Sequence, residues 1–582
     1  MFLSYSTNWH KYAFFFLFFC GTISIHAQTN STSSKKEGYS SDPKVVEKGK
    51  QLFLSNCTAC HNFTQKGIGP SLEKATTDLP SEWLTKFISN APEMISAGDA
   101  RAATLFEEYK QMMPTFTHLK PQEIESILAF IHTNQQKENT KDSYKGVVVT
   151  NPVEAKIQPA IWKMELKHFA TAPFTASKGP LARITKMDVL RGGAKERTFI
   201  VDLRGILYEL VDNQWQVYLD MAKERPNFIP IPGLATGFGS FAFHPEFYKN
   251  GLFYTTHTEK PNSAKADFGY ADSIKVTLQW VITEWKIDNP TASSFSGKSR
   301  EIFRINMVSP IHGMQEIAFN PTARKGSSDY GLLYVGIGDG GASENGFAFI
   351  CADNTRPWSS VLRIDPMGRN SKNGKYGIPK NNPFANDKNE KTLGEVYIRG
   401  FRNPNRYTWT TDGRLIVVDI GQTNIEELNI AKAGADYGWP EREGTFVINH
   451  RGKMDRVYAL PADEPRNKYT YPVVQYDHDE GKAISGGVVY NGTAVPALKG
   501  KYIFGDINNG RVFAVETDQL KLGKQANIQE VLLKIDGEEK TFLDLHPTIK
   551  PDLRLGEGPK GELFIFTKAD GKVYQVVGIS NP

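Results

Sequence analysis

The chain has 582 residues, of which 40% are hydrophobic and 23% are charged, and this balance excludes both a disordered chain and a protein with many membrane spans. A chain of this length exceeds what one hydrophobic core supports, so we expect more than one domain. The formal net charge of +5 gives no reason to expect a nucleic-acid partner. Four cysteines are too few for a disulfide-built scaffold.

The first predicted element is an export signal over residues 1–27. A mostly apolar run at 12–25 has the length of a signal-peptide core and is too short to span a bilayer comfortably. We expect cleavage after Ala27. A lipoprotein signal through Cys20 fits less well, because bulky phenylalanines precede that cysteine. The mature protein is therefore expected to be periplasmic or secreted, in an oxidising compartment and without a membrane span.

A haem-attachment motif follows a flexible polar segment at 28–42. The apolar residues of 45–53 recur at helical spacing, and this predicted helix leads to a CxxCH sequence. Cys57 and Cys60 can each bind one vinyl group of a haem, and His61 can then serve as the proximal iron ligand. A redox cysteine pair or half of a zinc site are the alternatives. The adjacent histidine and the exported context favour haem c.

The segment 43–138 resembles a class I cytochrome c, which implies a small all-α domain that carries one electron. In that family a methionine on the loop before the last helix supplies the sixth iron ligand. The resemblance favours Met113, which precedes a proline, and leaves Met112 as the alternative. Pro121 is expected to begin an amphipathic closing helix that packs against the first helix.

Six similar strand sequences recur after a linker predicted at 139–165. Their central apolar residues lie at positions 199, 253, 333, 415, 502 and 563, a mean spacing of about 73 residues. Repeats of this size, rich in aromatic residues and poor in helical periodicity, favour four-stranded propeller blades over a pair of β-sandwiches. The predicted fold is multidomain: an all-α cytochrome c domain followed by an all-β six-bladed β-propeller at 166–582.

An ordered set of short sequences in this second region resembles the soluble glucose/sorbosone dehydrogenases. In chain order the set comprises FHPEF at 243–247, HG at 312–313, GIGDGG at 336–341, LRIDP at 362–366, GFRNP at 400–404, DIGQ at 419–422 and YGWP at 437–440. Each match alone is weak, but the order and spacing hold over about 400 residues. The resemblance implies a six-bladed propeller that uses pyrroloquinoline quinone (PQQ) and Ca²⁺ to oxidise a sugar hydroxyl to a lactone.

The resemblance also implies roles for individual residues. His312 matches the base that takes the hydroxyl proton, and Asp339 matches the carboxylate that orients this base. Arg402 matches the guanidinium placed against the quinone oxygens, where it would polarise the carbonyl that receives hydride. Asn403 would hydrogen-bond the edge of the cofactor. The backbone carbonyls of 421–422, at Gly421 and Gln422, match part of the Ca²⁺ shell.

PQQ carries three carboxylates, so further basic residues are expected to line the channel. The best-studied branch of the family has a lysine after its fifth repeated strand, where this chain has Asn508, Asn509 and Arg511. It also has a pair of arginines in its sixth blade, where this chain has only Arg554, after Asp552. Arg511 and Arg554 are therefore the candidates for binding the cofactor's carboxylates.

These features together predict a PQQ-dependent sugar dehydrogenase for an aldose-type substrate, with electrons passed through haem c to an external acceptor. The fusion favours this function because a tethered haem raises the local concentration of an electron acceptor for the quinone. A non-catalytic propeller that binds a glycan or partner, with a redox-sensing haem, is the alternative from another class. A PQQ enzyme for a non-sugar alcohol or aldehyde is the third hypothesis.

Cys351 is expected to be a buried small residue and His478 a structural one.

Overall fold

The computed structural model describes residues 38–57, 61, 63, 69–109, 112–134, 144–231, 236–465, 467–547 and 549–581. The predicted export signal, Cys60 and the first part of the predicted linker lie outside these ranges. Within them, no helix combines the length and the apolar character that a membrane crossing requires.

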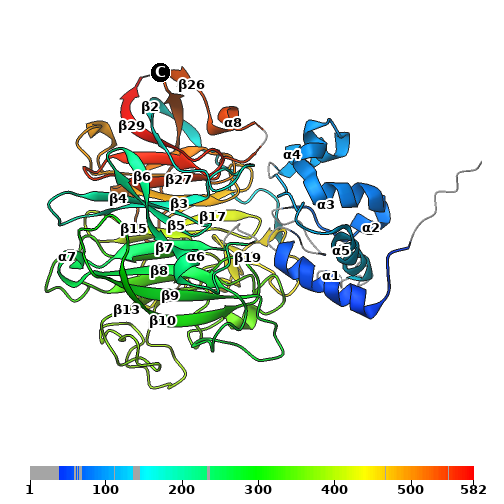
Figure 1. Ribbon diagram of the computed structural model, residues 1–582, viewed down its shortest axis with the longest axis horizontal. Coiled ribbons are helices and arrows are strands. Elements are labelled where there is room, and N and C mark those ends of the chain that lie inside the picture. Colours follow the sequence, from blue (N-terminus) through cyan, green and yellow to red (C-terminus); the bar gives the residue numbers. More distant parts are fainter. Residues whose placement is uncertain are drawn as a thin grey trace, which may run out of the picture. The chain divides into compact units, whose positions relative to one another are not determined.

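The N-terminal domain is helical in its described part (blue in Figure 1) and comprises α1 (Pro43–Asn56), α2 (Ala75–Asp78), α3 (Ser81–Ser96), α4 (Ala100–Tyr109) and α5 (Pro121–Asn134). The Asp42 side chain caps α1 by accepting a hydrogen bond from the Lys44 amide. Gly49 allows α1 and α5 to touch, because a Cβ there would lie 1.8 Å from the Ser126 carbonyl oxygen. Packing of the first helix against the last is thereby confirmed.

The first three blades of the large domain are four-stranded antiparallel sheets, each numbered here outward from the channel. They comprise β3 (Ile184–Leu190), β4 (Arg197–Asp202), β5 (Ile206–Val211) and β6 (Gln214–Asp220); β7 (Phe238–Phe243), β8 (Leu252–Glu259), β9 (Leu278–Ile287) and β10 (Gly297–Met307); and β11 (Glu316–Phe319), β12 (Leu333–Ile337), β13 (Ser360–Ile364) and β14 (Val396–Arg399).

The next two blades, four and five, repeat the four-strand order. The outer strand of the sixth blade comes from the start of the domain and also pairs in parallel with the outer strand of blade five, so these two blades form one nine-stranded sheet. Blades four to six comprise β15 (Arg406–Trp409), β16 (Leu415–Asp419), β17 (Ile425–Ile430) and β21 (Val474–Asp477); β22 (Ile484–Val489), β23 (Lys501–Asp506), β24 (Val512–Glu516) and β25 (Gln529–Ile535); and β27 (Leu553–Glu557), β28 (Leu563–Thr567), β29 (Lys572–Ser580) and β2 (Gln158–Thr171). Short helices α6 (Met221–Glu224), α7 (Phe247–Asn250) and α8 (Phe542–Leu545) and the two-residue strand β26 (Glu538–Glu539) lie in the connections.

The six repeated sequences all form the second strand of a blade, namely β4, β8, β12, β16, β23 and β28. The predicted six-bladed propeller is therefore confirmed, and the alternative of two β-sandwiches is wrong. The ring is closed by β2, which pairs antiparallel with β29 and thereby supplies the outer strand of the last blade from the N-terminal side of the domain (cyan against red in Figure 1). Because β2 begins at Gln158, part of the predicted linker is a propeller strand.

A second part of the predicted linker is also paired. β1 (Val148–Val149) forms an antiparallel ladder with β20 (Val457–Tyr458), which joins β19 (Phe446–Ile448) and β18 (Arg442–Glu443) in a small sheet. This small sheet is an insertion between β17 and β21 of blade 4. The chain is consequently fixed to the propeller from β1 onward, about a dozen residues after α5 ends.

Candidate active site

The candidate catalytic residues lie at one end of the propeller channel because of how the strands run. His312 and Arg402 precede the innermost strands β11 and β15, while Asp339 follows β12, which runs antiparallel to β11. Arg406, at the start of β15, donates to the carbonyl of Thr185 at the start of β3 and to that of Gln315 just before β11. The strand starts of three blades therefore meet at this end.

His312 and Asp339 form a buried pair. The His312 Nδ1 atom lies 2.7 Å from Asp339 Oδ1, and the two residues are 6% and 1% exposed. Burial and then the positive charge of Arg402 lower the pKa of His312 to about 4, despite the opposing effect of Asp339. The imidazole is therefore neutral near pH 7, with Nδ1–H donated to the carboxylate and a lone pair on Nε2.

The Asp339 carboxylate stays ionised in this environment. Burial favours its neutral form, but the hydrogen bond from His312, the charge of Arg402 and the Gly341 amide together hold its pKa below the ordinary value. The Gly341 amide donates to the same Oδ1 atom at 2.8 Å. Asp339 can therefore fix both the tautomer and the orientation of the imidazole.

The local backbone is shaped around this pair. His312 has φ of +50°, a left-handed conformation that a non-glycine residue adopts at a cost and that recurs at functional sites. Gly338 passes directly over it, since a Cβ there would lie 2.4 Å from the His312 carbonyl oxygen. The glycines of the GDGG sequence thus allow the loop after β12 to approach the loop before β11.

Hydrogen bonds to both the backbone and the guanidinium hold Arg402 in place. Its amide donates to Asp419 Oδ2 at 2.8 Å, while its Nε and Nη1 atoms donate to Gln422 Oε1 and the Gly421 carbonyl, each at 2.7 Å. Its carbonyl accepts from the Asp339 amide at 2.8 Å, which links the two blades directly. The guanidinium also lies 5.9 Å from the centre of the Trp439 ring.

Two buried carboxylates that the sequence did not single out support these loops. Asp419 accepts the amides of Arg402 and Asn403, and its pKa is raised well above the ordinary value by burial and then by Glu427. Glu443 Oε1 accepts the backbone amides of residues 422, 423, 424 and 425. These residues position the site. Asp419 belongs to the DIGQ motif at 419–422, whereas no local sequence pattern marks Glu443.

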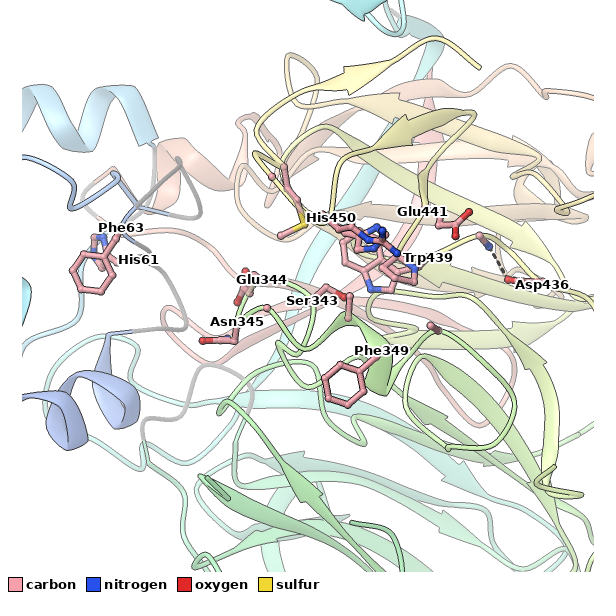
Figure 2. A pocket seen from close by; sticks show the side chains of 18 of the residues that line it. His61, Phe63, Ser343, Glu344, Asn345, Phe349, Asp436, Trp439, Glu441 and His450 are labelled. Atoms are coloured by element: carbon pink, nitrogen blue, oxygen red, sulfur yellow. Dashed lines mark hydrogen bonds between the residues drawn. The ribbon is translucent and has the colours of Figure 1, made fainter. Parts of the chain in front are cut away.

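A third carboxyl that sequence reasoning missed, Glu344, lies beside Arg402. Glu344 Oε2 accepts a hydrogen bond from Gln422 Nε2 at 3.1 Å and lies 4.0 Å from Arg402 Nη2. Burial raises its pKa to about 7. Figure 2 shows Glu344 with Ser343 and Trp439 among the side chains that line a pocket, so this carboxyl connects the pocket to Arg402. Its only sequence signal is its place in the loop after Asp339.

Three buried polar atoms around Arg402 have no hydrogen-bond partner among the described residues. They are Asn403 Oδ1, Glu344 Oε1 and Trp439 Nε1. A buried polar atom without a hydrogen-bond partner destabilises the fold. The Trp439 N–H donor and the two oxygen acceptors are therefore suited to hydrogen-bond a polar molecule that enters the site. The set of guanidinium, amide, carboxyl and indole N–H fits a planar, oxygen-rich quinone such as PQQ.

The fit to calcium is different. The Gly421 carbonyl already accepts a hydrogen bond from Arg402, and the Gln422 side chain bridges Arg402 and Glu344. Nowhere in the described ranges do three His, Cys, Asp or Glu side chains gather as a metal site. As arranged, these residues do not present a calcium site, and the calcium assignment at 421–422 stays a prediction.

The two basic candidates for the cofactor's carboxylates differ in their surroundings. Arg511 forms ion pairs with Glu480 and Glu530, each at 2.7 Å, so its guanidinium is engaged by the protein. Arg554 is buried at the start of β27 and pairs with Asp552 at 2.9 Å. Both residues lie at the end of the channel that carries His312, because Arg511 directly precedes β24 and Arg554 lies at the start of β27, but Arg511 is paired with two carboxylates and Arg554 with one.

Of the two residues expected to have structural roles, Cys351 is buried and His478 is partly buried. Cys351 is 3% exposed and contacts Ser343 Oγ at 3.3 Å, which confirms the expected burial, and burial raises its pKa to about 12. His478 Nε2 lies 2.9 Å from the buried Glu426. The Glu426 carboxyl is fully buried and the His478 side chain is 21% exposed, so the structural role of His478 stays a prediction.

The helical domain contains an apolar cavity with ligands of the kind that iron prefers. Cys57, His61 and Met113 line it, together with apolar residues that include Leu84, Ile88, Leu105, Ile127 and Leu128. His61 Nδ1 lies 2.9 Å from the Pro70 carbonyl oxygen, so Nδ1–H donates there and Nε2 is left for a metal. A Cβ on Gly69 would lie 2.5 Å from the His61 ring, which explains the glycine. Met112 does not line this cavity, and Cys60 lies outside the described residues.

Fold and site thus define a cytochrome c domain joined to a six-bladed propeller with a buried His–Asp–Arg cluster at one end of its channel. A family model for glucose/sorbosone dehydrogenase matches residues 210–575, and one for cytochrome c matches residues 46–135. Because the first match covers more than half of the chain, the protein belongs to the glucose/sorbosone dehydrogenase family.

Several curated proteins are similar to parts of this chain. The HIPL1 protein of Arabidopsis thaliana is 27% identical over 48% of this chain and 44% of its own length. The human Hedgehog-interacting protein is 25% identical over 67% of this chain and 50% of its own. Quinoprotein glucose dehydrogenase B of Acinetobacter calcoaceticus is 24% identical over 36% of this chain and 40% of its own. The chain thus spans half or less of the length of these relatives.

Solved structures of sugar dehydrogenases also align with this chain. The PQQ-bound aldose sugar dehydrogenase of Streptomyces coelicolor aligns with 71% of this chain and 96% of its own, at 18% identity and a TM-score of 0.46.

Proposed function

We propose that this protein is an exported PQQ-dependent dehydrogenase that oxidises an aldose-type sugar to its lactone and passes the electrons through its own haem c to an external acceptor. The observation that carries the proposal is the buried His312–Asp339 pair, 2.7 Å apart, beside the Arg402 guanidinium and three buried polar atoms suited to a bound quinone. PQQ, when bound, supplies the two-electron acceptor for the substrate's C–H bond.

His312 acts as the general base. Its Nε2 lone pair takes the proton of the sugar hydroxyl, and the imidazolium that forms is stabilised by the Asp339 carboxylate through the Nδ1–H bond. The low pKa of free His312, about 4, reflects burial beside Arg402, so the base is in its active form across the neutral range. A general base typically contributes roughly 10²–10⁴-fold to the rate.

Arg402, Asn403 and Glu344 bind the polar edges of cofactor and substrate. Arg402 provides a permanent positive charge. The Asp419 carboxylate accepts hydrogen bonds from the backbone amides of Arg402 and Asn403, and these bonds fix the position of Arg402 before any ligand arrives. Glu344, with a pKa near 7, can donate or accept a hydrogen bond through Oε1, which suits a sugar hydroxyl. Gly421 and Gln422 hold Arg402 through the Gly421 carbonyl and the Gln422 side chain, and their role as calcium carbonyls stays a prediction from the family resemblance.

The cytochrome domain carries the second part of the proposal. Cys57 and Cys60 would hold the haem covalently, with His61 and Met113 as its axial ligands. The His61–Pro70 hydrogen bond presets the imidazole for iron, and the lining of the cavity is mostly apolar. The short connection between α5 and β1 keeps the haem close to the propeller, whichever way the domains face.

The test uses the full chain with haem, reconstituted with PQQ and Ca²⁺, and follows haem reduction by absorbance on adding a panel of aldoses. At least one aldose should reduce the haem, and His312→Gln should slow this by roughly 10²–10⁴-fold. His168→Gln, which changes an exposed histidine on β2, is the matched control. Haem that stays oxidised with every aldose would contradict the proposal.

A second candidate function is a partner-binding propeller with a redox-sensing haem. It is favoured by the similarity to a protein named for its interaction with Hedgehog, which covers 67% of this chain. In the experiment above, failure to bind PQQ together with oxidised haem would favour this second function.

A further inference from the structure

A cluster of basic side chains lies at the same end of the channel as His312, in blade 6 and at the entry to blade 1. Lys568 directly follows β28, Arg554 is the second residue of β27, and Lys550 lies shortly before that strand. Arg183 directly precedes β3, two residues before Thr185, whose carbonyl binds Arg406. The cluster therefore adjoins the strand starts that carry the candidate active site.

Three cations of this cluster share one carboxylate. Asp552 Oδ1 lies 2.9 Å from Arg554 Nη2 and 3.2 Å from Lys568 Nζ, and Asp552 Oδ2 lies 3.9 Å from Lys550 Nζ. Asp506 adds a second negative charge near Arg554, which still leaves three cations facing two carboxylates. The contacts thus leave an excess of positive charge at the mouth of the channel.

This excess is held away from water, where it is costly. The side chains of Lys568 and Arg554 are 3% and 8% exposed, and Arg554 Nε has no hydrogen-bond partner among the described residues. Burial and then the charge of Arg554 lower the pKa of Lys568 well below its ordinary value, and Arg183 contributes in the same direction. An anion that enters the cluster would relieve both effects.

We propose that Lys568 and Arg554, with Arg183 beside them, bind a carboxylate of the quinone cofactor. This inference rests on the proposed function, because it takes PQQ as the ligand. PQQ brings three carboxylates, and Arg402, which precedes β15 in blade 4, accounts for only part of their charge. Arg511 is committed to Glu480 and Glu530, so Lys568 supplies the basic group that the sequence lacks around Asn508.

The test measures the Kd of PQQ for the full chain by quenching of tryptophan fluorescence and by calorimetry. Lys568→Met removes the charge, keeps the unbranched stem and leaves Asp552 paired with Arg554 and Lys550, so the fold should persist. We expect Kd to rise roughly 10–100-fold, as for loss of one charge-assisted hydrogen bond. Lys568→Arg should restore affinity to within about threefold of the original.

The matched control is Lys572→Met, four residues further on, where the lysine is 45% exposed and pairs with Asp570 at 3.6 Å. Its Kd should equal that of the unaltered protein. The trimethyl ester of PQQ, which lacks the carboxylate charges, provides the second probe. Lys568→Met and the unaltered protein should bind this ester equally.

The outcomes separate the two proposals. An unaltered protein that binds no PQQ overturns the proposed function and this inference with it. Unaltered PQQ affinity in Lys568→Met overturns the inference and leaves the proposed function standing. An equal loss of affinity for PQQ and for the ester in Lys568→Met would mean a general distortion of the site, and would also overturn the carboxylate-binding role.

Discussion

Asp339→Asn tests how far the orientation of His312 matters for the proposed reaction. The change keeps the size of the side chain, and its remaining oxygen can still accept the Gly341 amide, which now lies 2.8 Å from Asp339 Oδ1. What it removes is the charge that faces His312 Nδ1. An asparagine amide can also turn its NH₂ toward Nδ1, which would place the ring proton on Nε2 and block the base.

The expected magnitude follows from this one contact. A 2.7 Å charge-assisted hydrogen bond between two buried groups contributes about 1.5–3 kcal/mol. The bond strengthens as His312 becomes charged in the transition state, so its loss appears in kcat and should lower kcat roughly 10–100-fold. The Kd for PQQ should change little, because Asp339 makes no contact assigned to the cofactor.

The assay compares kcat for haem reduction at saturating PQQ and aldose in the original protein, in Asp339→Asn and in Asp353→Asn. Asp353 is an exposed carboxylate of a nearby loop that caps Thr355, so its variant should keep full activity. Unfolding temperature and Kd for PQQ are measured alongside. A kcat for Asp339→Asn within about twofold of the original, with the protein folded, would refute the orienting role.

Three further outcomes are expected. Met113→Ala should abolish the thioether absorbance of the low-spin haem while Met112→Ala keeps it, and the reverse pattern would reassign the ligand. In the folded protein the pKa of His312 is lowered from 6.5 to about 4, so the unfolded chain takes up the proton first as pH falls. The free energy of unfolding should therefore fall by about 3 kcal/mol between pH 6.5 and pH 4. His312→Gln should weaken this pH dependence in denaturant titrations, and an unchanged slope would contradict the assigned pKa. In rapid mixing with aldose and no external acceptor, haem reduction should be first-order at a rate independent of enzyme concentration, whereas a proportional rise would show transfer between molecules.

The sequence alone determined the features whose information is local. The CxxCH spacing around Cys57 predicts the haem site because bonded neighbours fix its geometry, and the six recurring apolar sequences predict one strand in each blade. His312 and Asp339 were identified by ordered motifs, one just before β11 and one just after β12, which lie at the same end of blade 3. Their pairing follows almost directly from the antiparallel arrangement of these two strands.

Only the tertiary structure decided what depends on closing the ring. Lys568 and Arg183 are separated by most of the propeller sequence and become neighbours only because blade 6 meets blade 1. The same closure requires β2 to leave the predicted linker and pair with β29. Glu344 reaches Arg402 only through the packing of blade 3 against blade 4. Local periodicity carries no record of such long-range pairings, because their free energy arises from burial and charge that exist only once distant segments meet.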